Sequence, residues 1–102
     1  MHDKGISHRD LKPENILLKS KVPGCISDPL NTILKIADLG AAKVLDSNFK
    51  NTPYVVSRYY RAPELILGSN KYTMSIDVWA AGCTLFELMT KTPLFPGESE
   101  GL

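Results

Sequence analysis

Residues 75–91 constrain the fold of this chain more than any other feature, because they form one long helical stretch. Ser75 suits the N-cap position, Asp77 suits the positive start of a helix and Lys91 suits its negative end. The apolar side chains cover nearly every face of this helix: Ile76, Val78, Trp79, Ala80, Ala81, Cys83, Leu85, Phe86, Leu88 and Met89. A helix that is apolar all round belongs inside a larger body. The rest of the 102 residues holds little to surround it, so we expect that part of the domain lies outside this chain.

The composition is that of an ordinary globular protein, with 43% hydrophobic and 23% charged residues. A net charge of +1 gives no electrostatic reason to expect a nucleic acid or an acidic membrane surface as a partner. Apolar stretches fall short of the ~20 residues that a membrane span needs, and no signal-peptide pattern follows Met1. Two cysteines fit a reducing compartment. We therefore expect a cytoplasmic or nuclear protein, with its oligomeric state unknown.

Short apolar runs at residues 16–18 and 33–36 flank a turn-rich segment, residues 19–32. This order predicts a β-hairpin with a long connection. Residues 38–61 carry almost no periodic signal, and a loop of that length in a compact domain is usually functional or disordered. Residues 62–68 suit a short helix, with a proline near its start and a glycine after its end.

Residues 8–15 read HRDLKPEN and fit the pattern H-R-D-L-x-x-x-N at every fixed position. In this motif the sequence resembles the catalytic loop of protein kinases, and Lys12 is typical of kinases that act on Ser and Thr. The resemblance implies that Asp10 is the base for the substrate hydroxyl and Asn15 a magnesium ligand. Lys12 would stabilise charge on the phosphoryl group and so help to bind the nucleotide. Taken alone, the motif has the composition of an ordinary charged turn.

Two further motifs follow in the order that protein kinases show. Residues 38–40 read DLG and resemble the D-F-G motif, whose aspartate binds magnesium; residues 62–64 read APE, which closes the activation segment. The resemblance makes Asp38 a ligand of the Mg²⁺ that accompanies ATP. Leu39 replaces the usual phenylalanine and reduces aromatic packing there. The interval from Asn15 to Asp38 is longer than is usual in the family, and a surface loop tolerates such an insertion.

Three other polar residues occupy positions that kinases use. Ser57 lies where the family has a Ser or Thr that bridges the catalytic Asp and Lys, although a simple Ser/Thr turn is the alternative. Asp77 is similar to a buried aspartate that hydrogen-bonds the catalytic-loop backbone, although it also suits a helix start. His8 is expected to be a packed core histidine.

Residues 52–64, TPYVVSRYYRAPE, narrow the resemblance to one branch of the kinases, and LFPG at 94–97 supports it. This branch holds the cyclin-dependent, mitogen-activated, glycogen synthase and dual-specificity tyrosine-regulated kinases. The segments SRYYRAPELI and PLFPGES are most similar to the glycogen synthase kinase (shaggy) type. Residues 52–54 are instead similar to c-Jun N-terminal kinases, and GCTLFEL is similar to the pre-mRNA-processing kinase.

The resemblance also predicts how the activation segment is regulated. Tyr54 is expected to be a phosphorylation site that orders this segment, with Thr52 as a second site. Arg9 and Lys43 match two of the three cations that, in the glycogen synthase type, receive a phosphate already present on the substrate. They could equally anchor a phosphorylated activation loop, and Lys43 alone could be a solvated surface lysine.

The resemblance implies a mainly α fold: a fragment of the large, C-terminal kinase lobe with a small β-hairpin and a long central helix. Residues 1–102 are then a partial kinase domain that lacks the small lobe and the last helices. The implied function is transfer of phosphoryl groups from MgATP to Ser or Thr hydroxyls of a protein substrate, with the isolated chain inactive. The alternative is a truncated, non-catalytic module that binds kinase partners or substrates.

Overall fold

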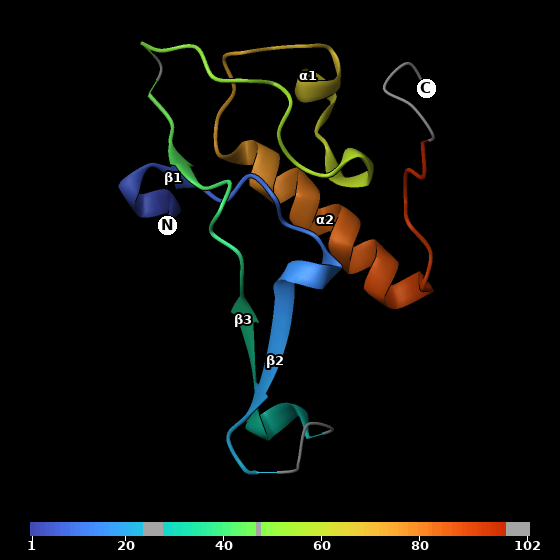
Figure 1. The fold of residues 1–102 in the computed structure, drawn as a ribbon. Coiled ribbons are helices and arrows are strands. Elements are labelled where there is room, and N and C mark those ends of the chain that lie inside the picture. The colour runs from blue at the N-terminus through green and yellow to red at the C-terminus, as the bar shows by residue number, and fades with distance from the viewer. Residues whose placement is uncertain (24–27, 47, 98–102) are drawn as a thin grey trace.

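The structure, a computed structural model, describes residues 1–23, 28–46 and 48–97. Its elements in chain order are β1 (Ile6–Ser7), β2 (Ile16–Ser20), β3 (Thr32–Ile36), β4 (Lys43–Val44), α1 (Pro63–Ile66) and α2 (Ser75–Thr90). Short 3-10 turns occupy His2–Lys4, Pro13–Asn15, Pro29–Asn31 and Arg58–Tyr60. In Figure 1 the β2–β3 hairpin projects away from a body that is built around α2.

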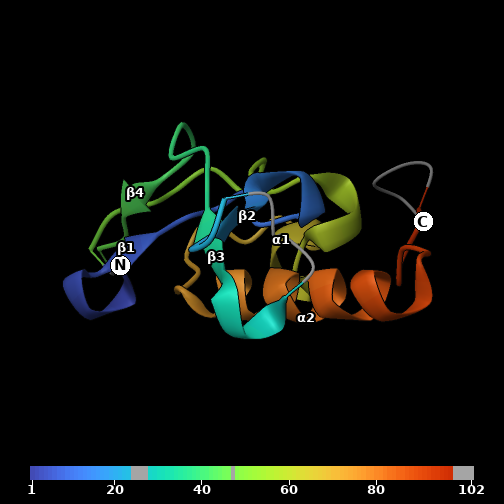
Figure 2. The same cartoon turned by 90° about the horizontal axis from the view of Figure 1, so that it is seen from below.

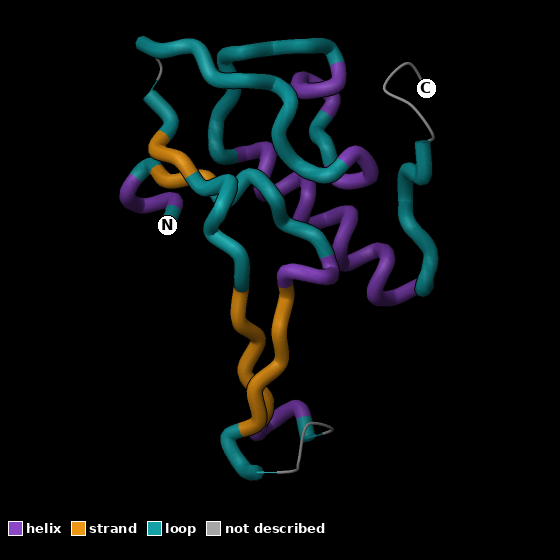
Figure 3. The backbone as a smooth tube through the Cα atoms, in the orientation of Figure 1, coloured by secondary structure: helices purple, strands orange, loops and turns teal. Residues whose placement is uncertain are grey.

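The predicted hairpin is confirmed. Strands β2 and β3 pair antiparallel from Ile16↔Ile36 to Ser20↔Thr32, and Figure 3 shows them as one extended arm. Asp28 begins the 3-10 turn that leads into β3, since its side chain accepts a hydrogen bond from the backbone N–H of Leu30. Apolar side chains on both faces of this arm are more than half exposed: Leu17, Leu18, Leu34 and Ile36.

A second antiparallel pair was not predicted. Strands β1 and β4 align Ile6 with Val44 and Ser7 with Lys43. Each strand has two residues, which is too short for an alternating pattern to appear in the sequence. The pairing places the two residues that precede the catalytic-loop motif beside the segment that follows Asp38.

Helix α2 covers the predicted stretch except for its last residue, and its predicted N-cap was wrong. Ser75 is the first helical residue, while Met74 takes the N-cap position without a side-chain cap. The hydroxyl of Thr73 accepts a hydrogen bond from the Ser75 backbone N–H at 3.3 Å. Lys91 lies just after the helix with φ 64°, and its N–H bonds a carbonyl of the last turn.

One face of α2 carries the core. Its buried residues Ile76, Ala80 and Cys83 belong to a cluster that also contains Leu11, Val56, Tyr60, Ala62, Leu65 and Tyr72. In Figure 2 most of the described chain lies on one side of α2, while the turn at the tip of the β2–β3 arm overlaps the helix. Large apolar side chains elsewhere on the helix are more than half exposed: Val78, Leu85, Leu88 and Met89. The helix is therefore apolar beyond the face that the described residues cover.

The expected mainly α class is not confirmed. Helices hold 35% of the described residues and strands 15%, so loops make up about half of the structure. The predicted helix at 62–68 is one turn, α1, which begins at Pro63 and is followed by Gly68 at φ 83°. Residues 48–57 form neither helix nor strand, and hydrogen bonds from Asn51 to Asn70 and from Ser57 to Asp10 hold them to other parts of the chain. None of the helices in the described ranges is long and apolar enough to cross a membrane.

Candidate active site

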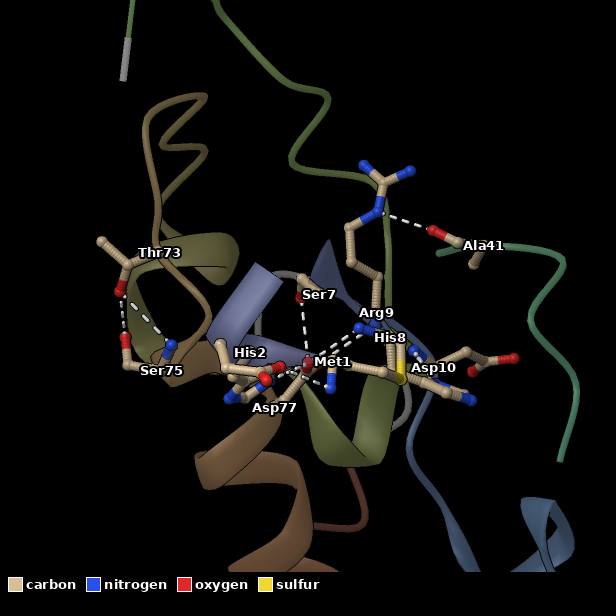
Figure 4. Close-up of polar contacts among 11 residues, drawn as sticks. Met1, His2, Ser7, His8, Arg9, Asp10, Ala41, Thr73, Ser75 and Asp77 are labelled. Atoms are coloured by element: carbon tan, nitrogen blue, oxygen red, sulfur yellow. Dashed lines mark hydrogen bonds and ion pairs between the residues drawn. The ribbon is translucent and has the colours of Figure 1, made fainter. Parts of the chain in front are cut away.

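The carboxylate of Asp77 organises the start of the catalytic-loop motif (Figure 4). Its Oδ2 accepts hydrogen bonds from the backbone N–H of His8 at 2.7 Å, from the Ser7 hydroxyl at 3.0 Å and from His2 Nε2 at 2.7 Å. Its Oδ1 accepts a hydrogen bond from the backbone N–H of Arg9 at 2.9 Å. The first turn of α2 therefore fixes the backbone of the loop that precedes Asp10.

These contacts keep Asp77 ionised although the residue is only 2% exposed. Burial by itself raises the pKa of this carboxyl, but the hydrogen bonds from His2, Arg9, His8 and Ser7 outweigh it and hold the pKa below its ordinary value. The same contacts hold Arg9 at φ 67°, a left-handed conformation that costs a non-glycine residue about 1–3 kcal/mol. The carboxylate thus stabilises a strained backbone one residue before Asp10.

His8 links the catalytic loop to the strand that precedes Asp38. Its Nδ1 accepts a hydrogen bond from the Asp10 backbone N–H at 3.1 Å, and its Nε2 lies 2.9 Å from the Ala37 carbonyl oxygen. An amide can only donate and a carbonyl can only accept, so Nε2 carries the proton and the ring is neutral. His8 is buried, so the prediction of a packed histidine is confirmed.

Asp10, Ser57 and Lys12 meet although Ser57 is far along the chain. The Ser57 hydroxyl donates to Asp10 Oδ1 at 3.0 Å and accepts from Lys12 Nζ at 3.1 Å. Lys12 Nζ lies 3.9 Å from Asp10 Oδ1. This is the bridge between the aspartate and the lysine that the resemblance predicted. It places a carboxylate and an ammonium group side by side at a half-buried position.

Asn15 and Asp38 lie at the same end of the β2–β3 hairpin. Asn15 immediately precedes β2, and its backbone oxygen accepts a hydrogen bond from the N–H of Ala37, the residue before Asp38. The Asn15 Nδ2 donates to the Asp10 backbone oxygen at 2.8 Å and to Asp10 Oδ2 at 3.3 Å. Asp38 is exposed, has φ 61°, and accepts a hydrogen bond from the Gly40 backbone.

The donor set at this end of the hairpin fits magnesium in part. It offers an amide oxygen from Asn15 and a carboxylate from Asp38, and Mg²⁺ in proteins commonly takes one or two carboxylates together with substrate phosphates and water. Within residues 1–23, 28–46 and 48–97, no group of three or more His, Cys, Asp and Glu side chains gathers around a point that could hold a metal. A cation here would therefore draw most of its ligands from a bound phosphate and water.

The expected regulatory residues do not gather at one point. Tyr54 is 73% exposed, and its backbone N–H donates to Thr52 Oγ1 at 3.2 Å. The Arg9 side chain points away from Asp77 and donates from Nε to the Ala41 carbonyl at 2.7 Å (Figure 4). Lys43 is exposed in β4. Arg9 thus lies against the segment that follows Asp38, which includes Lys43, and no hydrogen bond or ion pair joins either side chain to Tyr54 in the described part of the chain.

Several hydrogen-bonded pairs in and around the site were not predicted from the sequence. His2 bonds Asp77 across 75 positions, Arg9 bonds Tyr72 across 63, and the Tyr60 hydroxyl donates to Glu87 Oε1 at 2.6 Å. Burial and the hydrogen bond to Glu87 raise the pKa of Tyr60, so the phenol stays protonated. Glu87 stands out in the sequence as the carboxylate in the second half of an apolar helix, but nothing in the sequence identifies its partner.

Comparisons with known proteins identify the family of this chain. The protein kinase domain family matches residues 1–101. A protein named glycogen synthase kinase 1 from Pyricularia oryzae is 54% identical over 99 residues, and protein kinase gsk3 from Schizosaccharomyces pombe is 52% identical over 99 residues. Each alignment covers 97% of this chain and 23% of the relative, so the chain spans about a quarter of the length of these relatives. The predicted resemblance to the glycogen synthase kinase type is confirmed, and the chain belongs to the protein kinase domain family.

Proposed function

We propose that this chain is the catalytic centre of a protein serine/threonine kinase that transfers a phosphoryl group from MgATP to a protein substrate. One observation carries the proposal: the Ser57 hydroxyl joins Asp10 and Lys12, while Asn15 bonds the same aspartate. Phosphoryl transfer needs a base for the attacking hydroxyl and a cation for the charge on the transferred group. Asp10 and Lys12 supply these two groups at one position.

Each residue has a separate role in this proposal. Asp10 accepts the proton of the substrate hydroxyl, whose oxygen forms a bond to the transferred phosphorus as the bond to ADP breaks. Lys12 stabilises charge on the transferred group. The Ser57 hydroxyl fixes the position of the Lys12 ammonium group relative to the Asp10 carboxylate. Asn15 and Asp38 would hold Mg²⁺, which neutralises charge on the phosphates of ATP when it is bound. Positioning and electrostatics of this kind account for most of the catalysis of phosphoryl transfer.

The proposal includes a larger domain, called the parent kinase below, of which residues 1–102 are the central part. The relatives are about four times longer than the matched segment. Apolar side chains stand exposed on the β2–β3 arm and on α2, and each is worth roughly 1.5–3 kcal/mol when it is buried. The remainder of the parent kinase would cover these surfaces and the phosphates of the nucleotide. We keep for this parent the cytoplasmic or nuclear location that the sequence predicts.

We expect the isolated chain to transfer no phosphate at a useful rate, whereas the parent kinase transfers it from MgATP to a Ser- or Thr-containing peptide. The sequence holds no glycine-rich loop of the kind that covers the phosphates in protein kinases, and the exposed apolar side chains favour poor solubility or a molten state. Calorimetry with MgATP and a radiolabelled phosphate-transfer assay on both proteins measure the difference. A cooperative melt and micromolar ATP affinity for the chain alone, abolished in Asp38→Ala, would contradict this expectation. A parent without transfer activity would overturn the proposed function.

The second candidate is a non-catalytic module that binds partner proteins. The exposed apolar residues of α2 favour it, since a chain of this length would need a partner to cover them: Val78, Leu85, Leu88 and Met89. The polar site argues for the kinase, because a binding module does not need the contacts among Asp10, Lys12 and Ser57. An active parent whose activity is lost in Asp38→Ala decides for the kinase.

Phosphorylation of Tyr54 is the regulatory part of the proposal. We expect Tyr54→Phe in the parent kinase to lower kcat about tenfold or more, because a phosphate adds about −1.5 to −2 charge and makes one to three charge-assisted hydrogen bonds that order a loop. Mass spectrometry of the wild-type parent should find the phosphate on Tyr54. Thr52→Val is the matched variant for the second predicted site, two residues away. Unchanged activity in Tyr54→Phe together with an unmodified Tyr54 would reject this role.

A further inference from the structure

Tyr72 lies in the loop between α1 and α2, and the function proposed above gives it no role. It is 8% exposed, and its hydroxyl has two partners from distant parts of the chain. The hydroxyl donates to the Thr52 carbonyl oxygen at 2.7 Å and accepts from Arg9 Nη1 at 3.2 Å. A carbonyl can only accept and a guanidinium can only donate, so both directions are fixed. One phenol oxygen therefore joins the catalytic loop to the activation segment.

The two ends of this bridge are themselves held in place. The backbone of Arg9 is fixed by Asp77, and its Nε donates to the carbonyl of Ala41. At the other end, the N–H of Asn51 donates to the Asn70 carbonyl at 2.7 Å, two residues before Tyr72 in sequence. The Tyr72 hydroxyl thus lies between the residue that precedes the catalytic base and the residue that lies two positions before Tyr54.

We infer that Tyr72 is a positioning residue, whose hydroxyl holds the activation segment at Thr52 against Arg9 and so keeps Ser57 on Asp10. The inference rests on the proposed kinase function. Ser57 belongs to the same segment, five residues after Thr52, and reaches Asp10 across 47 positions of the chain. Loss of the hydroxyl removes the acceptor of the Arg9 Nη1 and the donor to the Thr52 carbonyl. The backbone around Thr52 and Tyr54 then becomes more mobile.

Tyr72→Phe in the parent kinase tests the inference, because it removes one oxygen and keeps the packed ring. We expect kcat to fall about tenfold with KM for ATP unchanged, as a hydrogen bond to a charged group is lost. Hydrogen exchange of residues 51–56 should become about tenfold faster. Tyr59→Phe is the matched control, because the Tyr59 side chain is partly exposed and its hydroxyl makes no hydrogen bond within the described ranges.

Hydrogen exchange also separates this inference from the proposed function, because it needs no activity. A parent without transfer activity would overturn the kinase proposal, and faster exchange at 51–56 in Tyr72→Phe would still establish the bridge. Unchanged exchange in Tyr72→Phe, or an equal change in Tyr59→Phe, would overturn the inference. Global unfolding of Tyr72→Phe would overturn it as well, because the hydroxyl would then be a determinant of stability and not of position. A change in KM for ATP as large as the change in kcat would also overturn the inference.

Discussion

Asp10→Asn in the parent kinase is expected to lower kcat by about 10²–10⁴-fold, the range over which a positioned general base contributes to rate. The substitution keeps the size of the side chain, and an amide oxygen can still accept the hydrogen bond from Ser57 at 3.0 Å. It removes the carboxylate that accepts the proton of the substrate hydroxyl. Steady-state kinetics with a Ser- or Thr-containing peptide measure the effect. KM for ATP should stay within about threefold, since the base acts on the substrate hydroxyl.

Glu14→Gln is the matched control for this substitution. Glu14 lies in the same motif, and its side chain is 66% exposed and 4.0 Å from Lys12. An exposed ion pair of this kind is worth about 0–1 kcal/mol, so the control should keep kcat within about fivefold of wild type. Two results contradict the role of Asp10: a kcat within tenfold of wild type in Asp10→Asn, or an equal loss in Glu14→Gln. Thermal melts of both variants exclude unfolding as the cause.

Local sequence patterns predicted the elements that depend on neighbouring residues. The β2–β3 hairpin follows from two short apolar runs around a turn-rich segment, and α2 follows from a continuous apolar stretch. The motif HRDLKPEN at residues 8–15 was recognised because its residues are contiguous. The position of Ser57 beside Asp10 came from the order of motifs in a resembling family, since no local pattern of charge or hydrophobicity points from residue 57 to residue 10.

Contacts between distant segments could not be predicted in the same way. Tyr72 is a single aromatic residue in a polar loop, and its two partners lie 20 and 63 positions away. The hydrogen bond of His2 to Asp77 was not predicted, because nothing in the sequence around an isolated histidine identifies a distant carboxylate as its partner. The mainly α expectation was not confirmed, because hydrogen bonds such as those from Arg61 to the carbonyls of Val55 and Val56 hold loop segments that have no periodic pattern.

Asp77→Ala is expected to destabilise the parent kinase by roughly 3–5 kcal/mol, the usual cost of removing one partner from a buried charged network. The variant leaves four donors without their acceptor: two backbone N–H groups, the Ser7 hydroxyl and His2. It also frees Arg9 from the contact that holds its left-handed backbone. The expected loss is a large part of the ~5–15 kcal/mol by which typical domains are stable. Urea denaturation followed by circular dichroism measures it.

The contribution of Asp77 to stability should also depend on pH. Its folded-state pKa lies below the ordinary value of 3.8, so the folded form holds its proton less tightly than the unfolded chain. The stabilisation is therefore fully present above about pH 4 and is lost as the pH falls through the folded-state pKa. The difference in free energy of unfolding between wild type and Asp77→Ala should shrink from pH 7 toward pH 3.

Asp3→Ala is the control, since Asp3 lies close to His2 in sequence and its side chain is 80% exposed. A surface substitution of this kind changes stability by about 0.5 kcal/mol or less, and the change should not depend on the network at Asp77. A loss below 1 kcal/mol in Asp77→Ala would show that the loop keeps its conformation without the carboxylate. A difference between wild type and Asp77→Ala that stays constant from pH 7 to pH 3 would contradict the lowered pKa, because the difference is independent of pH only when the folded and unfolded chains bind the proton of Asp77 equally tightly.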